Sequence, residues 1–318
     1  MPRLLLALVL AASQALAQTY PARPVRVMVG FAPGGPNDII ARAYSARLAE
    51  TLAQPFVIEN RTGAAGNLAA EAVARAAPDG YTLMLGSTGT NAVNPSLYAS
   101  LPFDAVRDLA PVSIVATSPS ALAVHPKVAA HSVRELIALA KAQPGKLTYA
   151  SAGSGSSQHL SAELFKRAAG VDIVHVPYKG AAPGITDLLA GQVDMSFAPV
   201  ANVVPYAKSG KLRLLAVTGA SRSAFAPGVP TVAESGLPGF DVITWYGVFA
   251  TAGTPAVVVD RLNSELRKIA QSPQLKEQLA GLGIDAAASA SPAEARAYRD
   301  AEVERWGKLV RALGVKAE

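Results

Sequence analysis

The stretch VRVMVGFAPGGPNDIIARAYSARL (25–48) contains the signals for a strand, a turn and a helix in succession. Residues 25–31 are apolar and rich in valine, which is typical of a buried parallel strand. The run PGGP (33–36) ends that strand, and apolar residues then recur with helical spacing at Ile40, Tyr44, Leu48 and Leu52. A second apolar run at 56–58 follows, so the chain is predicted to open with a βαβ unit.

Three later segments repeat this order of strand, polar turn and helix. They are TLMLGSTGTNAVNPSLY (82–98), LTYASAGSGSSQHLSAELF (147–165) and IVHVPYKGAAPGITDLL (173–189). Alternating strands and helices predict an α/β protein. Ligands of open α/β sheets bind at the carboxyl ends of strands, where free N–H groups and helix N-termini favour anions. Because no turn contains a complete catalytic set, the pattern favours capture of a small anion over its transformation.

The N-terminus has the three parts of a secretory signal peptide. Arg3 supplies the positive charge, residues 4–10 form a short apolar run, and ALA (15–17) is a small-x-small cleavage site. We therefore expect residues 1–17 to be removed and the mature chain to begin at Gln18 in the periplasm. No other stretch approaches the roughly 20 apolar residues that a membrane-spanning helix needs.

Composition excludes several classes of protein. The chain has no cysteine, which rules out disulfides and a lipidated cysteine at the cleavage site. Its net charge of +6 is open to two interpretations, steering of anionic ligands or a scattered solubilising surface. Aromatic residues make up only 6% of the chain and no three Lys or Arg are consecutive, so we expect no nucleic-acid partner.

The chain is long enough for two lobes, each with its own core. Residues 220–241 form a Pro-, Gly- and Ser-containing connection of the kind that passes between lobes. We expect residues 18–116 with 225–318 to form lobe 1, and residues 117–224 to form lobe 2, with a ligand cleft between them.

Separate strands are predicted at 112–116 and 121–124, where the chain first crosses to lobe 2. The return crossing is expected near 218–242. Helices are predicted at about 255–270, 273–281 and 292–312, and we expect the last of these to dock on lobe 1.

The glycine turns have neutral donors and few charges. In FAPGGPND (31–38), Asp38 falls in the first helical turn, where a structural role beside the helix dipole is favoured over ligand contact. In SAGSGSSQ (151–158), Gln158 stands where a dinucleotide fingerprint needs glycine, which excludes that motif. What remains is a set of N–H and serine donors for an oxyanion, with at least one serine expected only to cap a helix.

The two other turns add further candidates. In VPYKGAA (176–182), Tyr178 is expected to form a wall of the cleft, and Lys179 either meets a carboxylate or is solvated. GSTGTNA (86–92) contributes the neutral donors Ser87, Thr88, Thr90 and Asn91.

Motifs of common enzymes are absent from the sequence. It has no Gly-x-Ser-x-Gly, no His-Glu-x-x-His and no Walker loop, and its four histidines are not spaced as metal ligands. We expect His159 in the first turn of a helix as a packing or capping partner. Asp187 and Asp194 are not placed as an acid/base pair, and Asp194 is expected to hydrogen-bond at a turn or hinge. We therefore expect no metal and no catalytic residue.

Between about Tyr20 and Val310 the chain resembles extracytoplasmic solute receptors of the tripartite tricarboxylate transporter type, the Bug receptors. The resemblance rests on motifs in a fixed order: PARPVRVMVGFAPGGPND, VIENRTGAAGN, APDGYTLMLGSTGT, HSVRELIALAKAQPGKLTYASAGSGSSQHL, HVPYKGAAPGITDLLAGQVD, LAVTGASRS, VPTVAESGLPGF and WYGVFATAGTP. It implies an α/β, two-lobed periplasmic-binding-protein type II fold in which each lobe is a mixed sheet flanked by helices. It also implies no metal or organic cofactor, and a ligand carboxylate held between the lobes.

The resemblance also implies which residues face the ligand. Carried over by position, they are Phe31, Ala32, Pro33, Gly34, Gly35, Ser87, Thr88, Gly153, Ser154, Gly155, Ser156, Tyr178, Lys179, Gly180 and Ala181. The expected function is that of a monomeric periplasmic receptor, not an enzyme, which binds a small carboxylate and delivers it to inner-membrane transporter subunits. Two alternatives stay open: a receptor that feeds a signalling partner, and an exported hydrolase with Ser154 or Ser156 as nucleophile.

Overall fold

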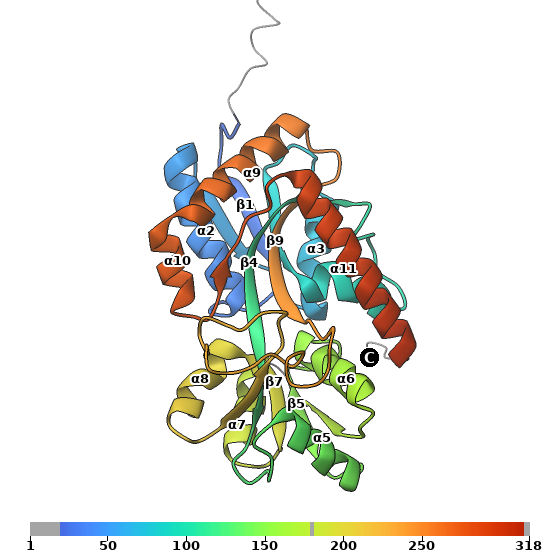
Figure 1. The fold of residues 1–318 in the computed structure, drawn as a ribbon. Helices are drawn as coiled ribbons and strands as arrows, with labels where there is room; N and C mark the ends of the chain where they lie inside the picture. Colours follow the sequence, from blue (N-terminus) through green and yellow to red (C-terminus); the bar gives the residue numbers. More distant parts are fainter. Residues whose placement is uncertain (1–19, 179–180, 315–318) are drawn as a thin grey trace, which may run out of the picture.

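The computed structural model describes residues 20–178 and 181–314, so the expected signal peptide and the candidates Lys179 and Gly180 lie outside the described residues. Figure 1 shows two lobes, with strand β4 (Leu109–Val124) running from one into the other. Strand β9 (Ile243–Thr251) lies beside β4 on the lobe 1 side of the junction. The two-lobed α/β fold predicted from the sequence is confirmed.

Lobe 1 is built on a mixed sheet. Its strand order is β2 (Phe56–Asn60), β1 (Val25–Val29), β3 (Thr82–Ser87), β9 and β4. The first three strands are parallel, as the opening βαβ unit requires, whereas β9 and β4 run antiparallel to their neighbours. Helices cover both faces of the sheet: α2 (Pro36–Leu52), α9 (Ala256–Gln271) and α10 (Pro273–Ala280) on one, α3 (Asn67–Ala74) and α11 (Pro292–Leu313) on the other.

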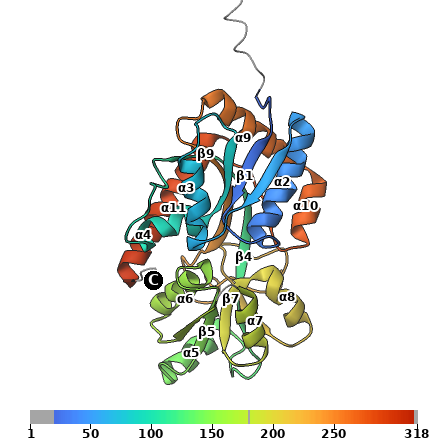
Figure 2. The ribbon, with the colours of Figure 1, turned by 180° about the vertical axis from the view of Figure 1, so that it is seen from behind.

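Lobe 2 has a smaller mixed sheet. Its order is β4, β7 (Met195–Pro199), β5 (Thr148–Ser151) and β6 (Val174–Pro177), with β8 (Arg213–Val217) also paired to β4. The helices are α5 (Val133–Ala142), α6 (Ser157–Ala169), α7 (Ala181–Leu189) and α8 (Val200–Lys208). Short elements complete the chain: η1 (Ala64–Gly66), η2 (Gly89–Val93), α4 (Asn94–Leu97) and β10 (Asp285–Ala286). Figure 2 shows α6, α7 and α8 in the lobe below β1 and α2.

The first crossing is one continuous strand, so the prediction of separate strands at 112–116 and 121–124 was wrong. Strand β4 pairs with β9 as far as Pro119 and with β7 from Ser120 onward. A proline without an N–H is tolerated in a strand where regular pairing is interrupted. Pro119 does not break β4 because it lies at the point where the strand exchanges one sheet for the other. Strand β9 itself was not predicted from the sequence.

The long connection at 220–242 packs on lobe 2. Thr231 forms a bridge with Val217 of β8, and the Val242 N–H donates to the Thr218 carbonyl at 2.8 Å. Ala226 belongs to the apolar core of lobe 2, and Phe225 packs against that core. These contacts favour a return to lobe 1 near Val242, later in the chain than the expected boundary at 224/225.

The C-terminal helix α11 docks on lobe 1, as expected. Trp306 and Val310 are buried there. The indole N–H groups of Trp245 in β9 and of Trp306 both donate to Glu302 Oε2, at 3.0 and 2.9 Å. The bond from Trp245 fixes α11 to the strand that returns from lobe 2, and the bond from Trp306, within α11, helps to orient the Glu302 carboxylate. Within the described residues, every helix is too short or too polar to span a membrane.

Candidate functional site

The predicted ligand loops follow the carboxyl ends of strands β1 and β3 in lobe 1 and of β5 and β6 in lobe 2. Strand β1 enters lobe 1 at the end far from lobe 2 and runs toward the junction (Figure 1). The lobe 2 loop reaches lobe 1 directly, because a Cβ placed on Gly155 would overlap the side chain of Leu97 in α4. The loop of residues 151–156 therefore contacts α4 of lobe 1 where the lobes join.

The loop of residues 31–35 is fixed by the carboxylate of Asp38. That carboxylate accepts from the Gly34 N–H at 3.0 Å, from Arg42 Nε at 2.9 Å and from Asn60 Nδ2 at 2.9 Å. Asn60 Nδ2 also donates to the Phe31 carbonyl at 3.0 Å. The Arg42 hydrogen bond, helped by those from Gly34 and Asn60, lowers the Asp38 pKa to about 2 despite burial. The structural role predicted for Asp38 is confirmed.

The loop itself lies at the surface, but its two glycine amides are already engaged, because the Gly34 N–H donates to Asp38 and the Gly35 N–H donates to the Ala32 carbonyl at 3.4 Å. Ala32, Pro33 and Gly34 are exposed, and Gly34 has φ +82°, a conformation that favours glycine. Gly35 is the N-cap of α2 and has no side chain to satisfy the first N–H groups of the helix. The arrangement suits an anion held by backbone amides.

The donors at the end of β3 are partly engaged within the protein. The Ser87 N–H donates to Asn91 Oδ1 at 3.1 Å, and Thr88 Oγ1 accepts from the Trp245 N–H at 2.8 Å. Thr90 Oγ1 donates to the Ala65 carbonyl at 2.9 Å. Ser87 and Thr88 are both buried, so their hydroxyls are not at the open surface of the junction.

Three buried amide groups of lobe 1 have no hydrogen-bond partner for their nitrogen among the described residues. They are the Nδ2 atoms of Asn37 in the first turn of α2, of Asn67 at the start of α3, and of Asn91. A buried donor without a partner is costly, so each of these groups calls for a water or a ligand atom. The Asn37 side chain was not in the predicted site. An amide residue directly after the Gly-Gly-Pro turn was the signal that could have identified it.

The loop of residues 151–156 in lobe 2 is shaped by its serines. Ser151 Oγ accepts from the Gly153 N–H at 3.1 Å and lies 3.2 Å from the Gly153 carbonyl. Ser156 Oγ accepts from the His159 N–H at 3.3 Å and caps α6, which confirms that at least one serine is a cap. Ser154 is exposed, and Gly153 and Gly155 have φ +124° and +78°.

Two stacked histidines lie beneath this loop. The Gly155 N–H donates to His159 Nδ1 at 3.0 Å, and His175 Nε2 lies 2.6 Å from Ser151 Oγ. The two imidazole rings stack with centroids 4.1 Å apart and planes 7° apart, and Tyr149 stacks on His175 with centroids 4.8 Å apart. Burial lowers the pKa of both histidines, that of His175 to about 4. His159 is a packing and capping partner in the first turn of α6, as expected, whereas a role for His175 was not predicted.

Tyr178 closes the other side of the lobe 2 loop. Its N–H donates to the Ser151 carbonyl at 3.1 Å and its hydroxyl donates to Asp187 at 2.6 Å. Burial and Asp187 together raise the Tyr178 pKa to about 12. Ala181 begins α7 directly after the two residues that are not described.

The remaining carboxylates and histidines do not form an enzyme-like cluster. Asp187 bonds Tyr178, whereas Asp194 accepts from Thr148 N and Oγ1 at 2.8 and 2.9 Å. Asp194 is thus a hydrogen-bonder at a strand start, as predicted. The serine that meets a histidine is the buried Ser151, and not Ser154 or Ser156. No group of three or more His, Asp or Glu that could hold a metal occurs among the described residues.

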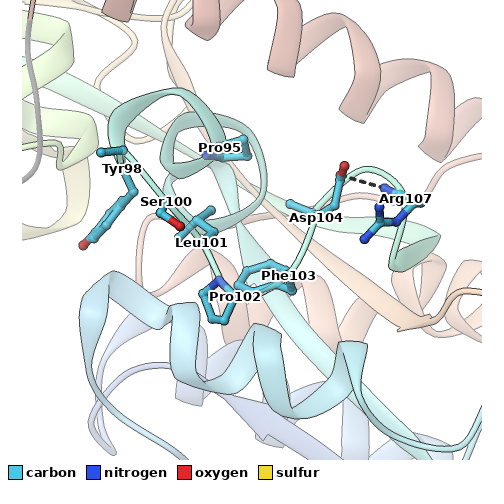
Figure 3. A pocket seen from close by; sticks show the side chains of 10 residues that line it. Pro95, Tyr98, Ser100, Leu101, Pro102, Phe103, Asp104 and Arg107 are labelled. Carbon is cyan, nitrogen blue, oxygen red and sulfur yellow. Dashed lines mark hydrogen bonds between the residues drawn. The ribbon is translucent and has the colours of Figure 1, made fainter.

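Two cavities of the structure lie outside these loops. Figure 3 shows one of about 420 Å³ after α4, lined by Pro95, Tyr98 and Leu101 to Ala105, with Arg107 bonded to Asp104 at its edge. Another, of about 530 Å³, lies between α7 and α8. Neither cavity contains a predicted ligand residue, so the assignment of the ligand loops stays a prediction.

Comparisons with known proteins point to one family of receptors. A family model described as "Tripartite tricarboxylate transporter family receptor" matches residues 40–315. The chain is 41% identical over 292 residues to a "UPF0065 protein in tcbD-tcbE intergenic region" of Pseudomonas sp. (strain P51), covering 92% of this chain and 86% of the relative. It is 40% identical over 301 residues to "Protein BugT" of Bordetella pertussis, covering 94% and 92%.

Solved structures agree with this match. "R. palustris Rpa4515 with adipate" superposes with a TM-score of 0.84 at 37% identity, covering 93% of this chain and 99% of that one. "MatC (Rpa3494) from Rhodopseudomonas palustris with bound malate" gives 0.78 at 35% identity, covering 92% and 100%. The alkanesulfonate-binding protein SsuA of Xanthomonas axonopodis pv. citri, with a TM-score of 0.52 at 14% identity and coverage of 93% and 94%, shares the fold alone.

Proposed function

This chain belongs to the tripartite tricarboxylate transporter family of receptors, and on that premise we propose that it binds a small carboxylate in the periplasm and delivers it to the transporter's inner-membrane subunits. The observation that carries the proposal is that two glycine-rich loops, 31–35 in lobe 1 and 151–156 in lobe 2, each lie at the N-terminus of a long helix, and that the second loop contacts Leu97 of lobe 1. Backbone amides at helix N-termini suit a carboxylate. Adipate and malate in the two related structures support this class of ligand.

The proposed receptor acts as a monomer and has no catalytic residue or cofactor. The proposed ligand contacts are the predicted loop residues Phe31 to Gly35, Ser87, Thr88, Gly153 to Ser156, and Tyr178 to Ala181, to which we add the side chain of Asn37. Asn37 is added because its buried Nδ2 has no partner among the described residues at the start of α2.

We also propose that the lobes close about the crossing strands when the ligand binds. Strand partners change at Pro119–Ser120 and the chain returns near Val242, so these positions are the proposed lobe boundaries. The lobes also touch at Gly283, where a Cβ would overlap Ala201 of α8. A ligand shifts such an equilibrium only by binding the closed form more tightly.

Calorimetry of the mature protein with a panel of mono-, di- and tricarboxylates, including malate and adipate, tests the proposal. We expect at least one acid to bind with a Kd of about 10 μM or tighter, with a smaller radius of gyration in X-ray scattering. A folded protein that binds none of the acids would overturn it.

A pair of glycine variants tests whether the ligand lies at the predicted loop. Gly34 and Gly210 have φ +82° and +72°, and a Cβ at either has nothing within 4 Å. Each glycine-to-alanine change is therefore expected to cost about 1 kcal/mol of stability through the backbone alone. Gly34→Ala is expected to weaken binding at least about tenfold, and Gly210→Ala less than about twofold. Equal losses in the two variants would place the ligand elsewhere.

A further inference from the structure

We propose that His159 and His175 are positioning residues for the lobe 2 ligand loop, and that uptake of a proton by the stacked pair weakens ligand binding. The inference rests on the proposed function, because it concerns the loop of residues 151–156 that would hold the carboxylate. Each imidazole is bonded to a different part of that loop, and neither is offered as a ligand contact.

His159 holds the loop by accepting a hydrogen bond. Its Nδ1 accepts from the Gly155 N–H at 3.0 Å, so this nitrogen carries no proton in the observed arrangement. Ser156 and His159 also bond through the cap of α6, and the ring is buried, with 6% of its surface exposed. A proton on Nδ1 would place two donors opposite each other, and the Gly155 amide would have to turn away.

His175 holds the loop through Ser151. Its Nε2 lies 2.6 Å from Ser151 Oγ, and that hydroxyl bonds both the N–H and the carbonyl of Gly153. A hydroxyl has one proton and two lone pairs, so a change of proton at His175 changes which of these bonds the Ser151 hydroxyl can make. Gly153 and Gly155 are thus fixed by separate rings of one stack.

The surroundings of the stack resist a charge on either ring. The ring centroids are 4.1 Å apart, so two imidazolium ions would repel each other strongly. Three further titratable groups face the stack: Tyr149 of β5, which stacks on His175, and Glu163 and Lys166 of α6. Glu163 is already shared between the Tyr149 hydroxyl at 2.7 Å and Lys166 Nζ at 2.8 Å. Both rings are therefore neutral near pH 7.

The direction of the effect separates positioning from simple charge. An added positive charge near the site would by itself strengthen the binding of an anion. Loss of the Gly155 and Gly153 geometry weakens it, because these two bonded glycines set the place of Ser154, which lies between them in the loop proposed to hold the carboxylate. A fall in affinity on acidification is therefore the signature of the positioning role.

The first experiment needs no ligand. In ¹⁵N NMR spectra of the mature protein between about pH 8 and 5, the Gly155 amide and the His159 imidazole are expected to titrate together. In His159→Asn, whose Oδ1 can still accept from the Gly155 N–H, the amide signal is expected to stay constant. If the Gly155 amide signal of the unaltered protein does not change as His159 titrates, the inference is overturned.

The second experiment measures binding of malate and adipate by calorimetry between about pH 8 and 4, because the pKa values of both rings are lowered. We expect the unaltered protein to lose at least about fivefold in affinity over this range. His159→Asn is expected to keep the affinity at about pH 7.5 within threefold and to flatten the profile, whereas His159→Leu loses at least about tenfold at every pH. The ligand ionises in the same way in the measurements on the unaltered protein and on His159→Asn. This variant is therefore the matched control.

The two proposals fail in different ways. If neither acid binds the unaltered protein at about pH 7.5, and no other acid of the panel does, the carboxylate receptor fails while the NMR titration still decides the role of His159. If an acid binds and His159→Asn keeps the pH profile of the unaltered protein, the positioning role fails alone.

Discussion

The two ligand loops are held in place by different chemistry. The loop of residues 31–35 is fixed by Asp38, an ionised carboxylate that accepts from Gly34, Arg42 and Asn60. The loop of residues 151–156 is fixed by the neutral rings of His159 and His175. Both sets of hydrogen bonds satisfy backbone groups that a glycine turn leaves open, but only the second depends on groups whose neutral form makes the bonds and whose protonation would break them.

This difference teaches that the two halves of one site need not respond alike to their surroundings. The hydrogen bonds that lower the Asp38 pKa to about 2 keep its carboxylate ionised far into the acid range. Burial lowers the pKa of the histidines, but they begin to bind protons well before Asp38 does. Acid is therefore expected to loosen lobe 2 of the site while lobe 1 keeps its shape.

Removal of the Asp38 carboxylate, which fixes the lobe 1 loop, has the largest expected effect. Asp38→Ala leaves the Gly34 N–H and the Asn60 amide without their acceptor, and we expect it to lower the free energy of unfolding by about 2–3 kcal/mol in urea titrations. Arg42→Ala is the control: the Arg42 side chain is 54% exposed, so its loss should cost less than about 1 kcal/mol. If the two variants lost the same stability, the carboxylate would not be the anchor of this loop.

The contact between the lobe 2 loop and helix α4 of lobe 1 comes next. Gly155→Ala places a Cβ against Leu97 at φ +78°, and we expect a loss of about 2 kcal/mol of stability. Gly170→Ala at the end of α6 has φ +63° and open space, so it should cost only about 1 kcal/mol. A double-mutant cycle with Leu97→Ala is expected to show coupling of about 1 kcal/mol. If the losses of stability in the two single variants add up to that of the double variant, Gly155 and Leu97 are not in contact.

The pH dependence of stability distinguishes the groups that fix the two loops. The folded-state pKa of His175 is about 4, below its ordinary value of 6.5, so the neutral ring contributes stability that is present above pH 6.5 and is lost as the pH falls toward 4. Asp38 contributes stability that is present above pH 3.8 and is lost as the pH falls toward 2. Thermal unfolding of His175→Gln should flatten the first window, and that of Asp38→Asn the second. The same profile in all three proteins would contradict the assignment.

The smallest expected effect is at the edge of the lobe 2 loop. Tyr178→Phe removes the hydroxyl that donates to Asp187 but keeps the ring, and we expect a loss of about 1 kcal/mol in urea titrations. Ligand affinity should change less than about threefold if the ring, and not the hydroxyl, forms the wall of the cleft. Tyr206→Phe on α8 is the control and should stay within about 0.5 kcal/mol. A larger loss of affinity than of stability would make the hydroxyl a ligand contact.

Much of the fold and part of the site could be predicted from local signals. The strand and helix after Val25, the structural role of Asp38, the capping serine and the place of His159 each depend on residues within a turn or two of one another. Two features were missed because they depend on distant partners. Strand β9 has its partners in β3 and β4, and residues 225–242 pack on lobe 2 through Val217 and Thr218.

The sequence by itself determined the order of strands and helices, the glycine turns and the receptor family, because periodicity, turn chemistry and ordered motifs are local properties of the chain. Only the tertiary structure decided that β4 is one strand shared by two sheets and that His175 stacks on His159. The physical reason is that both depend on how one element packs against another, in β4 through pairing with β9 and β7 and in the histidines through packing of α6 on β6. A local pattern shows that a segment forms a strand or a helix, but it does not show which other element that segment will contact.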